Sequence, residues 1–142
     1  WKFKDSRKYH ITIIPHWLVD DIDELLETCR NMELELPKFD LEYTIAEAVW
    51  DLDGDQIIWA LATMSKEFNF IRKTIAEALQ KQIFEDFLIH TTLANNYTQN
   101  QLPFEKKKLT DIGFKIEKIE LIANIDNGRS SYYKPIYSWK LL

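Results

Sequence analysis

Two short segments of this sequence repeat one pattern of residue types, and the pattern suits proton transfer. Each segment has a histidine, one further residue, a threonine and then an apolar residue. The first contains His10 and Thr12, and the second contains His90 and Thr92. Side chains alternate along a β-strand, so within each segment the histidine and the threonine would share one face. If the two strands lie side by side, two proton-transfer groups and two hydroxyl donors converge, as a reaction at phosphate requires.

The composition describes a single globular domain that covers residues 1–142. Hydrophobic residues make up 46% of the chain, which is enough for a sizeable core. The net charge of -5 argues against binding of long nucleic acid, because that requires a broad basic surface; a small anionic ligand remains compatible with it. The single cysteine, Cys29, excludes an internal disulfide and fits a reducing compartment.

No apolar run is long enough to span a membrane, and the first residues do not resemble a signal peptide. We therefore expect a monomeric cytoplasmic protein that does not bind membranes. The chain begins at Trp1 rather than at methionine, which fits a domain excised from a longer protein or polyprotein.

Hydrophobic spacing and turn residues predict the elements that must position the two motifs. Helices are expected to begin after Asp21, with Glu24 completing a capping box, and after Ser65. Turns at 53–55 and 127–128 join hairpins, and 95–110 is expected to be a loop with a short helical turn. Strands are predicted over 9–14, 39–52, 56–64, 87–94, 114–125 and 132–142. Segregated helices and hairpin-joined strands predict an α+β fold.

The twin motif resembles the signature of the two-histidine (2H) phosphoesterase superfamily, which has one His-x-Thr/Ser-apolar motif in each half of a pseudo-symmetric α+β fold. Residues 9–14 and 89–94 are similar to its two motif strands, and 119–139 is similar to its closing hairpin. The spacing looks closest to viral 2′,5′-phosphodiesterases of the coronavirus, torovirus and rotavirus kind. The resemblance implies two lobes of antiparallel sheet, helices packed on the outside and a central cleft.

The resemblance also implies a mechanism that needs no metal or other cofactor. His10 and His90 would be the acid–base pair, and Thr12 and Thr92 would bind the phosphate of a short 2′,5′-linked oligoadenylate. Free histidine titrates near ~6.5, so two histidines can hold opposite protonation states near neutrality; which of them is the base stays open. Cleavage would remove a signal that activates a ribonuclease in the cytoplasm of the host.

Two other functions remain open on the sequence. The first keeps the fold and changes the substrate, as in a phosphodiesterase that opens 2′,3′-cyclic or cyclic-oligonucleotide phosphates. The second is a non-catalytic module that binds nucleotides or RNA ends. The presence of both histidines and both threonines disfavours the module. One departure from the family pattern is that Asn95 and Asn96 stand where cellular relatives often have a basic residue.

Other residues could contact a substrate or a metal. Trp17 and Tyr133 could stack on a base, and Arg129 could reach a terminal phosphate, although packing or a solvated turn is the simpler interpretation of each. His16 could complete a zinc site with the two motif histidines, but Pro15 disturbs the strand alternation that this would require. The aspartates of the 51–55 turn lack the glutamate of a calcium loop, so a hairpin turn explains them better.

Overall fold

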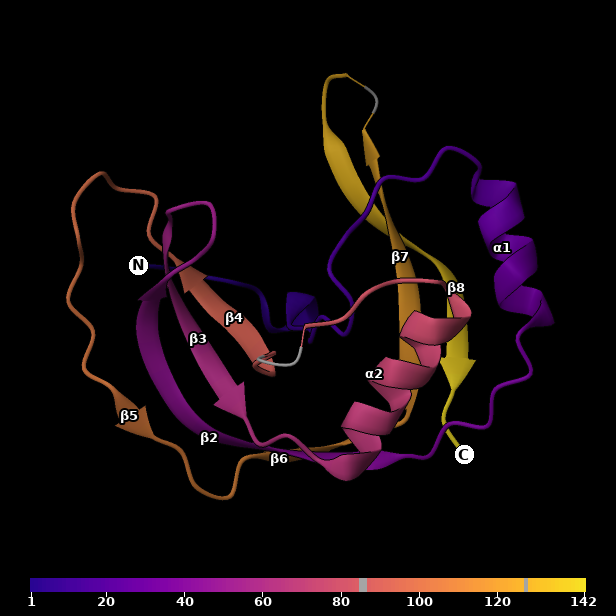
Figure 1. Cartoon of the computed structure of the whole chain (residues 1–142). Coiled ribbons are helices and arrows are strands. Elements are labelled where there is room, and N and C mark those ends of the chain that lie inside the picture. Colours follow the sequence, from indigo (N-terminus) through magenta and orange to yellow (C-terminus); the bar gives the residue numbers. More distant parts are fainter. Residues whose placement is uncertain (85–86, 127) are drawn as a thin grey trace. The chain divides into compact units, whose positions relative to one another are not determined.

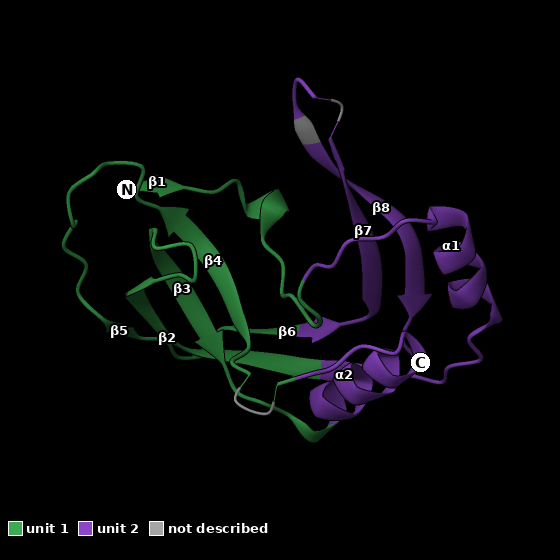
Figure 2. Ribbon diagram, turned by 45° about the horizontal axis from the view of Figure 1, so that its top comes forward, with its two compact units in different colours: residues 1–15, 40–66, 84–114 green, residues 16–39, 67–83, 115–142 purple. Residues whose placement is uncertain are grey.

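The computed structural model describes residues 1–84, 87–126 and 128–142 (Figure 1). The chain forms two compact units, each assembled from three separate stretches of sequence (Figure 2). Unit 1 contains 1–15, 40–66 and 84–114, and unit 2 contains 16–39, 67–83 and 115–142. The regular secondary structure of the described residues consists of antiparallel strands, two α-helices and a short 3₁₀ helix, which confirms the predicted α+β class.

Unit 1 is built on an antiparallel sheet, most of which is green in Figure 2; the first residue of β2 and the end of β6 belong to unit 2. The strands lie in the order β1 (Lys2–Phe3), β4 (His90–Asn95), β3 (Gln56–Ala62), β2 (Phe39–Trp50) and β5 (Lys107–Lys108), and β6 (Gly113–Ile116) also pairs with β2. The predicted hairpin of β2 and β3 is confirmed. In its turn, Gly54 has a φ of 87°, and the carboxylate of Asp51 accepts hydrogen bonds from the backbone of Asp53 and Asp55. The three aspartates thus form the hairpin turn, as the sequence predicted.

Unit 2 contains helix α1 (Ile22–Asn31), nearly all of α2 (Lys66–Ala78) and the hairpin of β7 (Lys118–Asp126) and β8 (Ser131–Lys140). The side chain of Asp21 caps α1 by accepting a hydrogen bond from the backbone N–H of Glu24, which confirms the predicted start. The buried apolar side chains of the two helices and the hairpin form much of the core of this unit. They are Cys29, Phe68, Ile71, Ile75, Ala76, Ile119 and Trp139.

The strand predicted over 9–14 is absent, so that prediction is wrong. The edge of β4 is taken instead by β1, and the backbone N–H of Lys4 donates to the carbonyl of Leu93. The chain then turns in a 3₁₀ helix, Ser6–Lys8, which is capped by the side chain of Asp5 as it accepts a hydrogen bond from the backbone N–H of Arg7. Tyrosine, isoleucine and threonine favour a strand only where another strand offers a ladder, and 9–14 pairs with none.

Two further predictions are corrected by the sheet topology. The strand predicted over 114–125 is interrupted at Glu117: β6 pairs with β2, whereas β7 pairs with β8. The segment 95–110 contains no helical turn and carries the short strand β5 instead. Of the predicted turn at 127–128, Asn127 lies outside the described residues, while Gly128 has a φ of 84° and donates its backbone N–H to Asp126.

Cys29 is fully buried in unit 2, and burial raises the pKa of its thiol, so it has the character of a packing residue. Within the described ranges, neither helix is long and apolar enough to cross a membrane.

Candidate functional site

The four motif residues all belong to unit 1, but the two motifs have different local structures. His90 and Thr92 lie in β4, where His90 pairs with Leu61 and Thr92 pairs with Trp59 of β3. The pleat of the strand therefore places His90 and Thr92 on the same face, as the sequence predicted. Both side chains are half-buried.

The first motif follows the 3₁₀ helix and has no regular secondary structure. The backbone N–H of Tyr9 closes the 3₁₀ helix by donating to the carbonyl of Ser6. His10 and Thr12 are both exposed to solvent, and only Ile11 between them is half-buried. This motif is thus positioned by a turn and not by a sheet.

Despite this difference, the two histidines make the same hydrogen bond. Nδ1 of His10 lies 2.9 Å from the carbonyl oxygen of Lys8, and Nδ1 of His90 lies 3.1 Å from the carbonyl oxygen of Leu88. A carbonyl oxygen only accepts, so each Nδ1 carries a proton and donates it. Nε2 is then the ring nitrogen that takes up or releases a proton in both residues. The backbone two residues earlier therefore sets the same tautomer in each motif.

The threonine hydroxyls of the two motifs are available to a ligand. Within the described chain, neither Thr12 nor Thr92 makes a side-chain hydrogen bond. Thr91, by contrast, points to the opposite face of β4, where it is buried and hydrogen-bonded to the hydroxyl of Tyr43 on β2. Burial raises the pKa of Tyr43, and the hydrogen bond to Thr91 partly opposes that increase. The Tyr43 ring also packs edge-on against Phe114.

Trp59 supports the ring of His90 on the motif face. The two ring centroids are 4.8 Å apart, with an angle of 43° between the planes. Nε1 of Trp59 donates to Oε1 of Glu47 at 3.2 Å, and Oε2 of Glu47 lies 3.6 Å from Nζ of Lys106. The indole is therefore anchored at its polar edge, and its ring restricts how far the imidazole can rotate.

Sequence reasoning missed Trp59 and Glu47, although a signal for their pairing was present. The turn at 53–55 fixes the register of the hairpin, in which Trp50 pairs with Gln56 and, three residues further from the turn, Glu47 pairs with Trp59. That pairing could have been counted outward from the turn. The neighbour of Trp59 on the other side could not, because β4 joins β3 across a long stretch of sequence.

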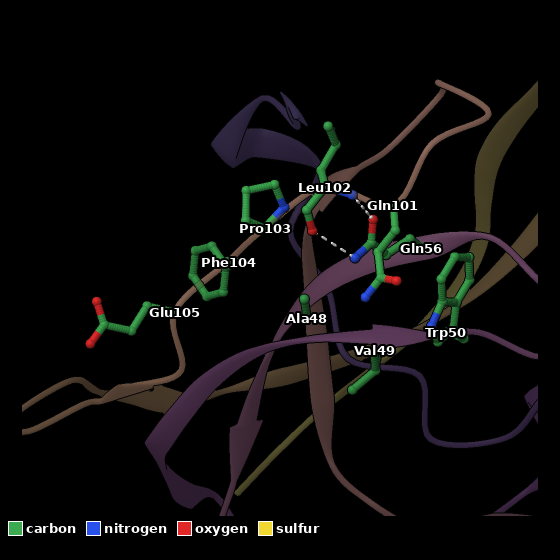
Figure 3. A pocket seen from close by; sticks show the side chains of 9 residues that line it. All are labelled: Ala48, Val49, Trp50, Gln56, Gln101, Leu102, Pro103, Phe104 and Glu105. Carbon is green, nitrogen blue, oxygen red and sulfur yellow. Dashed lines mark hydrogen bonds between the residues drawn. The ribbon is translucent and has the colours of Figure 1, made fainter.

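A cavity of about 460 Å³ lies at the other end of the sheet of unit 1 (Figure 3). Gln56 anchors the loop that covers it: Nε2 donates to the carbonyl of Leu102, and Oε1 accepts from the backbone of Leu102 and the side chain of Asn96. Gln56 alternates with Ile57 along β3, so it faces away from the side that carries Trp59 and Thr92. Gln56 and the loop that it anchors are thus turned away from the motif histidine His90, and Asn96 has a structural role.

The three further substrate-binding candidates, Trp17, Arg129 and Tyr133, all lie in unit 2. Trp17 is half-buried, and Nζ of Lys81 lies 4.9 Å from the centre of its ring, so one ring face is already covered. Tyr133 is 77% exposed on β8, and its ring is open to a ligand. Arg129 is exposed in the turn before β8. In the ranges that the structure describes, no group of three histidine, cysteine or acidic side chains could hold a metal ion.

No protein-family model matches the chain, and no curated protein matches it in sequence. Several solved structures share its fold. The crystal structure of TT0787 of Thermus thermophilus has a TM-score of 0.71 at 14% identity, covering 99% of this chain and 82% of that one. A structure described as a phosphoesterase has a TM-score of 0.69 at 16% identity, covering 99% and 81%. E. coli LigT complexed with 3′-AMP has a TM-score of 0.67 at 15% identity, covering 99% and 80%. At these identities the similarity establishes a common fold.

Proposed function

We propose that this protein is a metal-independent phosphodiesterase of the 2H type that cleaves short 2′,5′-linked oligoadenylates. The observation that carries the proposal is the matched state of His10 and His90: each holds Nδ1 on a carbonyl and keeps Nε2 for proton transfer. The fold shared with a solved phosphoesterase supports it. LigT, which has this fold, was crystallised with 3′-AMP and with ATP, so that protein accommodates small nucleotides.

In the proposed reaction, Nε2 of one histidine takes the proton of the 3′-hydroxyl that lies beside the 2′,5′-phosphate. The 3′-oxygen attacks phosphorus, and the bond from phosphorus to the 5′-oxygen breaks. The leaving 5′-oxygen receives a proton from Nε2 of the other histidine. The products are a 2′,3′-cyclic phosphate and a fragment with a free 5′-hydroxyl, so protons balance without water. The hydroxyls of Thr12 and Thr92 donate to the non-bridging oxygens, where charge develops.

The 2′,5′ linkage follows from the resemblance to the viral phosphodiesterases. In the same proposal, cleavage removes the host's oligoadenylate signal and so blunts the ribonuclease that this signal activates. The histidine pair and the threonine pair would serve equally for opening a 2′,3′-cyclic phosphate, because that step uses the same acid and base. The substrate on which the protein is active therefore has to be determined by comparing several substrates in one assay.

The test is to incubate the protein in excess EDTA with 2′,5′-linked diadenylate, 3′,5′-linked diadenylate and 2′,3′-cyclic AMP, and to separate the products. We expect cleavage of the 2′,5′ isomer to a cyclic phosphate, with a bell-shaped dependence of kcat on pH. The variants His10→Ala and His90→Ala should each lose nearly all activity. His16→Ala is the matched control, because His16 is exposed, lies in unit 2 and belongs to neither motif.

Each other outcome overturns a stated part of the proposal. Activity on the cyclic substrate alone would replace the 2′,5′-phosphodiesterase by a cyclic phosphodiesterase. Loss of activity in EDTA would contradict the metal-independent mechanism. Full activity in either motif variant would show that the histidine pair is not the acid–base pair.

A further inference from the structure

The short strand β5 places lysines on the same face of the sheet as the second motif. Lys108 pairs with Ile45 of β2, Ile45 pairs with Leu61 of β3, and Leu61 pairs with His90 of β4. Directly paired residues of an antiparallel sheet project to the same side. These four paired residues form one row across four strands, with Lys108 at one end and His90 at the other.

A second row on the same face ends in another lysine. Thr92 pairs with Trp59, and Trp59 pairs with Glu47. Nζ of Lys106 lies 3.6 Å from Oε2 of Glu47, which places this lysine beside Lys108 on the motif face. Lys106 and Lys108 have exposed side chains, and in the described part of the chain Lys108 makes no ion pair.

Lys107, between them, faces the other way. It pairs with Ala46, which pairs with Ala60, which pairs with the buried Thr91. The run of three lysines is thus divided by the pleat: two lie on the motif face and one lies on the opposite face. Only Lys106 and Lys108 can therefore act together with the second motif, and Lys107 provides a matched control on the other face.

The spacing of the row fixes what the lysines can reach. Three strand intervals separate the backbone of His90 from that of Lys108, which is about 14 Å in an antiparallel sheet. The phosphate under attack lies at the histidine end, so the lysines are too far away to contact it. They are within reach of another charged group on the same nucleotide chain, and ammonium groups bind phosphate well as point charges.

We propose that Lys106 and Lys108 form a second phosphate subsite, which binds a substrate phosphate other than the one that is cleaved. That phosphate is either a 5′-terminal phosphate or the next phosphate between nucleotides. The inference rests on the proposed function and refines it, because it makes the enzyme prefer substrates that carry more than one phosphate. Between the subsite and the motif lie Ile45 and Glu47 of β2 and Trp59 and Leu61 of β3. Glu47 is the ion-pair partner of Lys106, so among the described residues Lys108 carries the unpaired charge of the subsite.

The experiment compares three 2′,5′-linked substrates: a diadenylate with a free 5′-hydroxyl, the same diadenylate with a 5′-phosphate, and a triadenylate with a free 5′-hydroxyl. For each, kcat/KM is measured at two salt concentrations with the wild-type protein, the double variant Lys106→Ala/Lys108→Ala and the control Lys107→Ala. The readout is the preference, which is the ratio of kcat/KM for a two-phosphate substrate to that for the plain diadenylate. Circular dichroism of each variant verifies the fold.

We expect the double variant to lower the preference roughly threefold to tenfold, as two exposed charge interactions would. The change should appear in KM and not in kcat, because the subsite is remote from the reacting atoms. Higher salt should lower the wild-type preference in the same way, and Lys107→Ala should leave it within about twofold of wild type. If the 5′-phosphorylated diadenylate shows the effect, the subsite binds a terminal phosphate. If the triadenylate shows it, the subsite binds a phosphate between nucleotides.

Two results would overturn the subsite and would not be confused with failure of the enzyme assignment. If wild-type protein cleaves the plain diadenylate but shows no preference for a second phosphate, the subsite does not exist. If Lys107→Ala lowers the preference as much as the double variant does, the preference depends on the total positive charge of the protein and not on lysines of the motif face. If the plain diadenylate is not cleaved at all, the proposed function fails, and the subsite fails with it.

Discussion

The two histidine motifs have the same residue pattern and the same histidine hydrogen bond, but they differ in secondary structure, burial and packing. Each histidine holds Nδ1 on the carbonyl two residues earlier. His90 is also paired in a sheet and packed against an indole, whereas His10 is exposed in a segment without regular structure. The two motifs thus share the tautomer of the histidine and a threonine two residues later. They do not share the secondary structure that holds these residues in place.

A consequence of this contrast is that the same substitution should have different costs in the two motifs. On the proposed function, residues of the second motif should contribute to both folding and activity, since the strand that carries them is part of the core sheet. The exposed residues of the first motif, His10 and Thr12, should contribute chiefly to activity. Measurements of activity and of unfolding free energy on matched pairs of variants therefore test the comparison directly.

The largest effect is expected from the histidines themselves. His10→Ala and His90→Ala should each lower kcat by about 10²–10⁴-fold, the usual contribution of a positioned acid or base. Only His90→Ala should also lower the free energy of unfolding, by about 0.5–1.5 kcal/mol, because it removes a ring that packs on Trp59. Steady-state kinetics and urea denaturation measure the two quantities. An equal loss of stability in both variants would contradict the difference in support.

The middle residues of the motifs give the next largest contrast. Thr91→Val leaves the buried hydroxyl of Tyr43 without its partner, which should cost about 1–3 kcal/mol of unfolding free energy. Ile11→Val at the equivalent position removes one methylene from a half-buried side chain and should cost less than about 1 kcal/mol. Urea denaturation midpoints with unchanged m-values measure both costs. Equal costs would show that the two motifs are packed alike.

Much of this arrangement is local and could be predicted. The two helices follow from apolar spacing and from the cap at Asp21, and the register of β2 and β3 follows from the turn at 53–55. The pairing of β4 with β3 and of β5 with β2 depends on contacts between distant parts of the chain, which neither spacing nor propensity encodes. For the same reason the residues 9–14 have the composition of a strand without being one.

A smaller effect is expected from the indole that supports only one of the two histidines. Trp59→Leu should lower kcat about threefold to tenfold with little change in KM, because His90 loses the ring that restricts its rotation. Trp59→Phe should recover part of the loss, since it retains an aromatic contact. Trp50→Leu is the control, because Trp50 is exposed and pairs with Gln56 on the opposite face. A rise in KM alone would assign Trp59 to substrate binding instead.

The smallest effect is a dependence of stability on pH that only the second motif should show. Burial raises the pKa of Tyr43, so above the ordinary tyrosine value of about 10 the unfolded chain releases this proton more readily than the folded chain does. The unfolded state then binds fewer protons, and stability falls as pH rises, by at most about 1.4 kcal/mol per pH unit for one group. Tyr43→Phe should remove this component of the slope from about pH 10 upward. The control Tyr9→Phe, which alters the tyrosine beside His10, should keep this component of the slope. If the component survives in Tyr43→Phe, then Tyr43 is not its source.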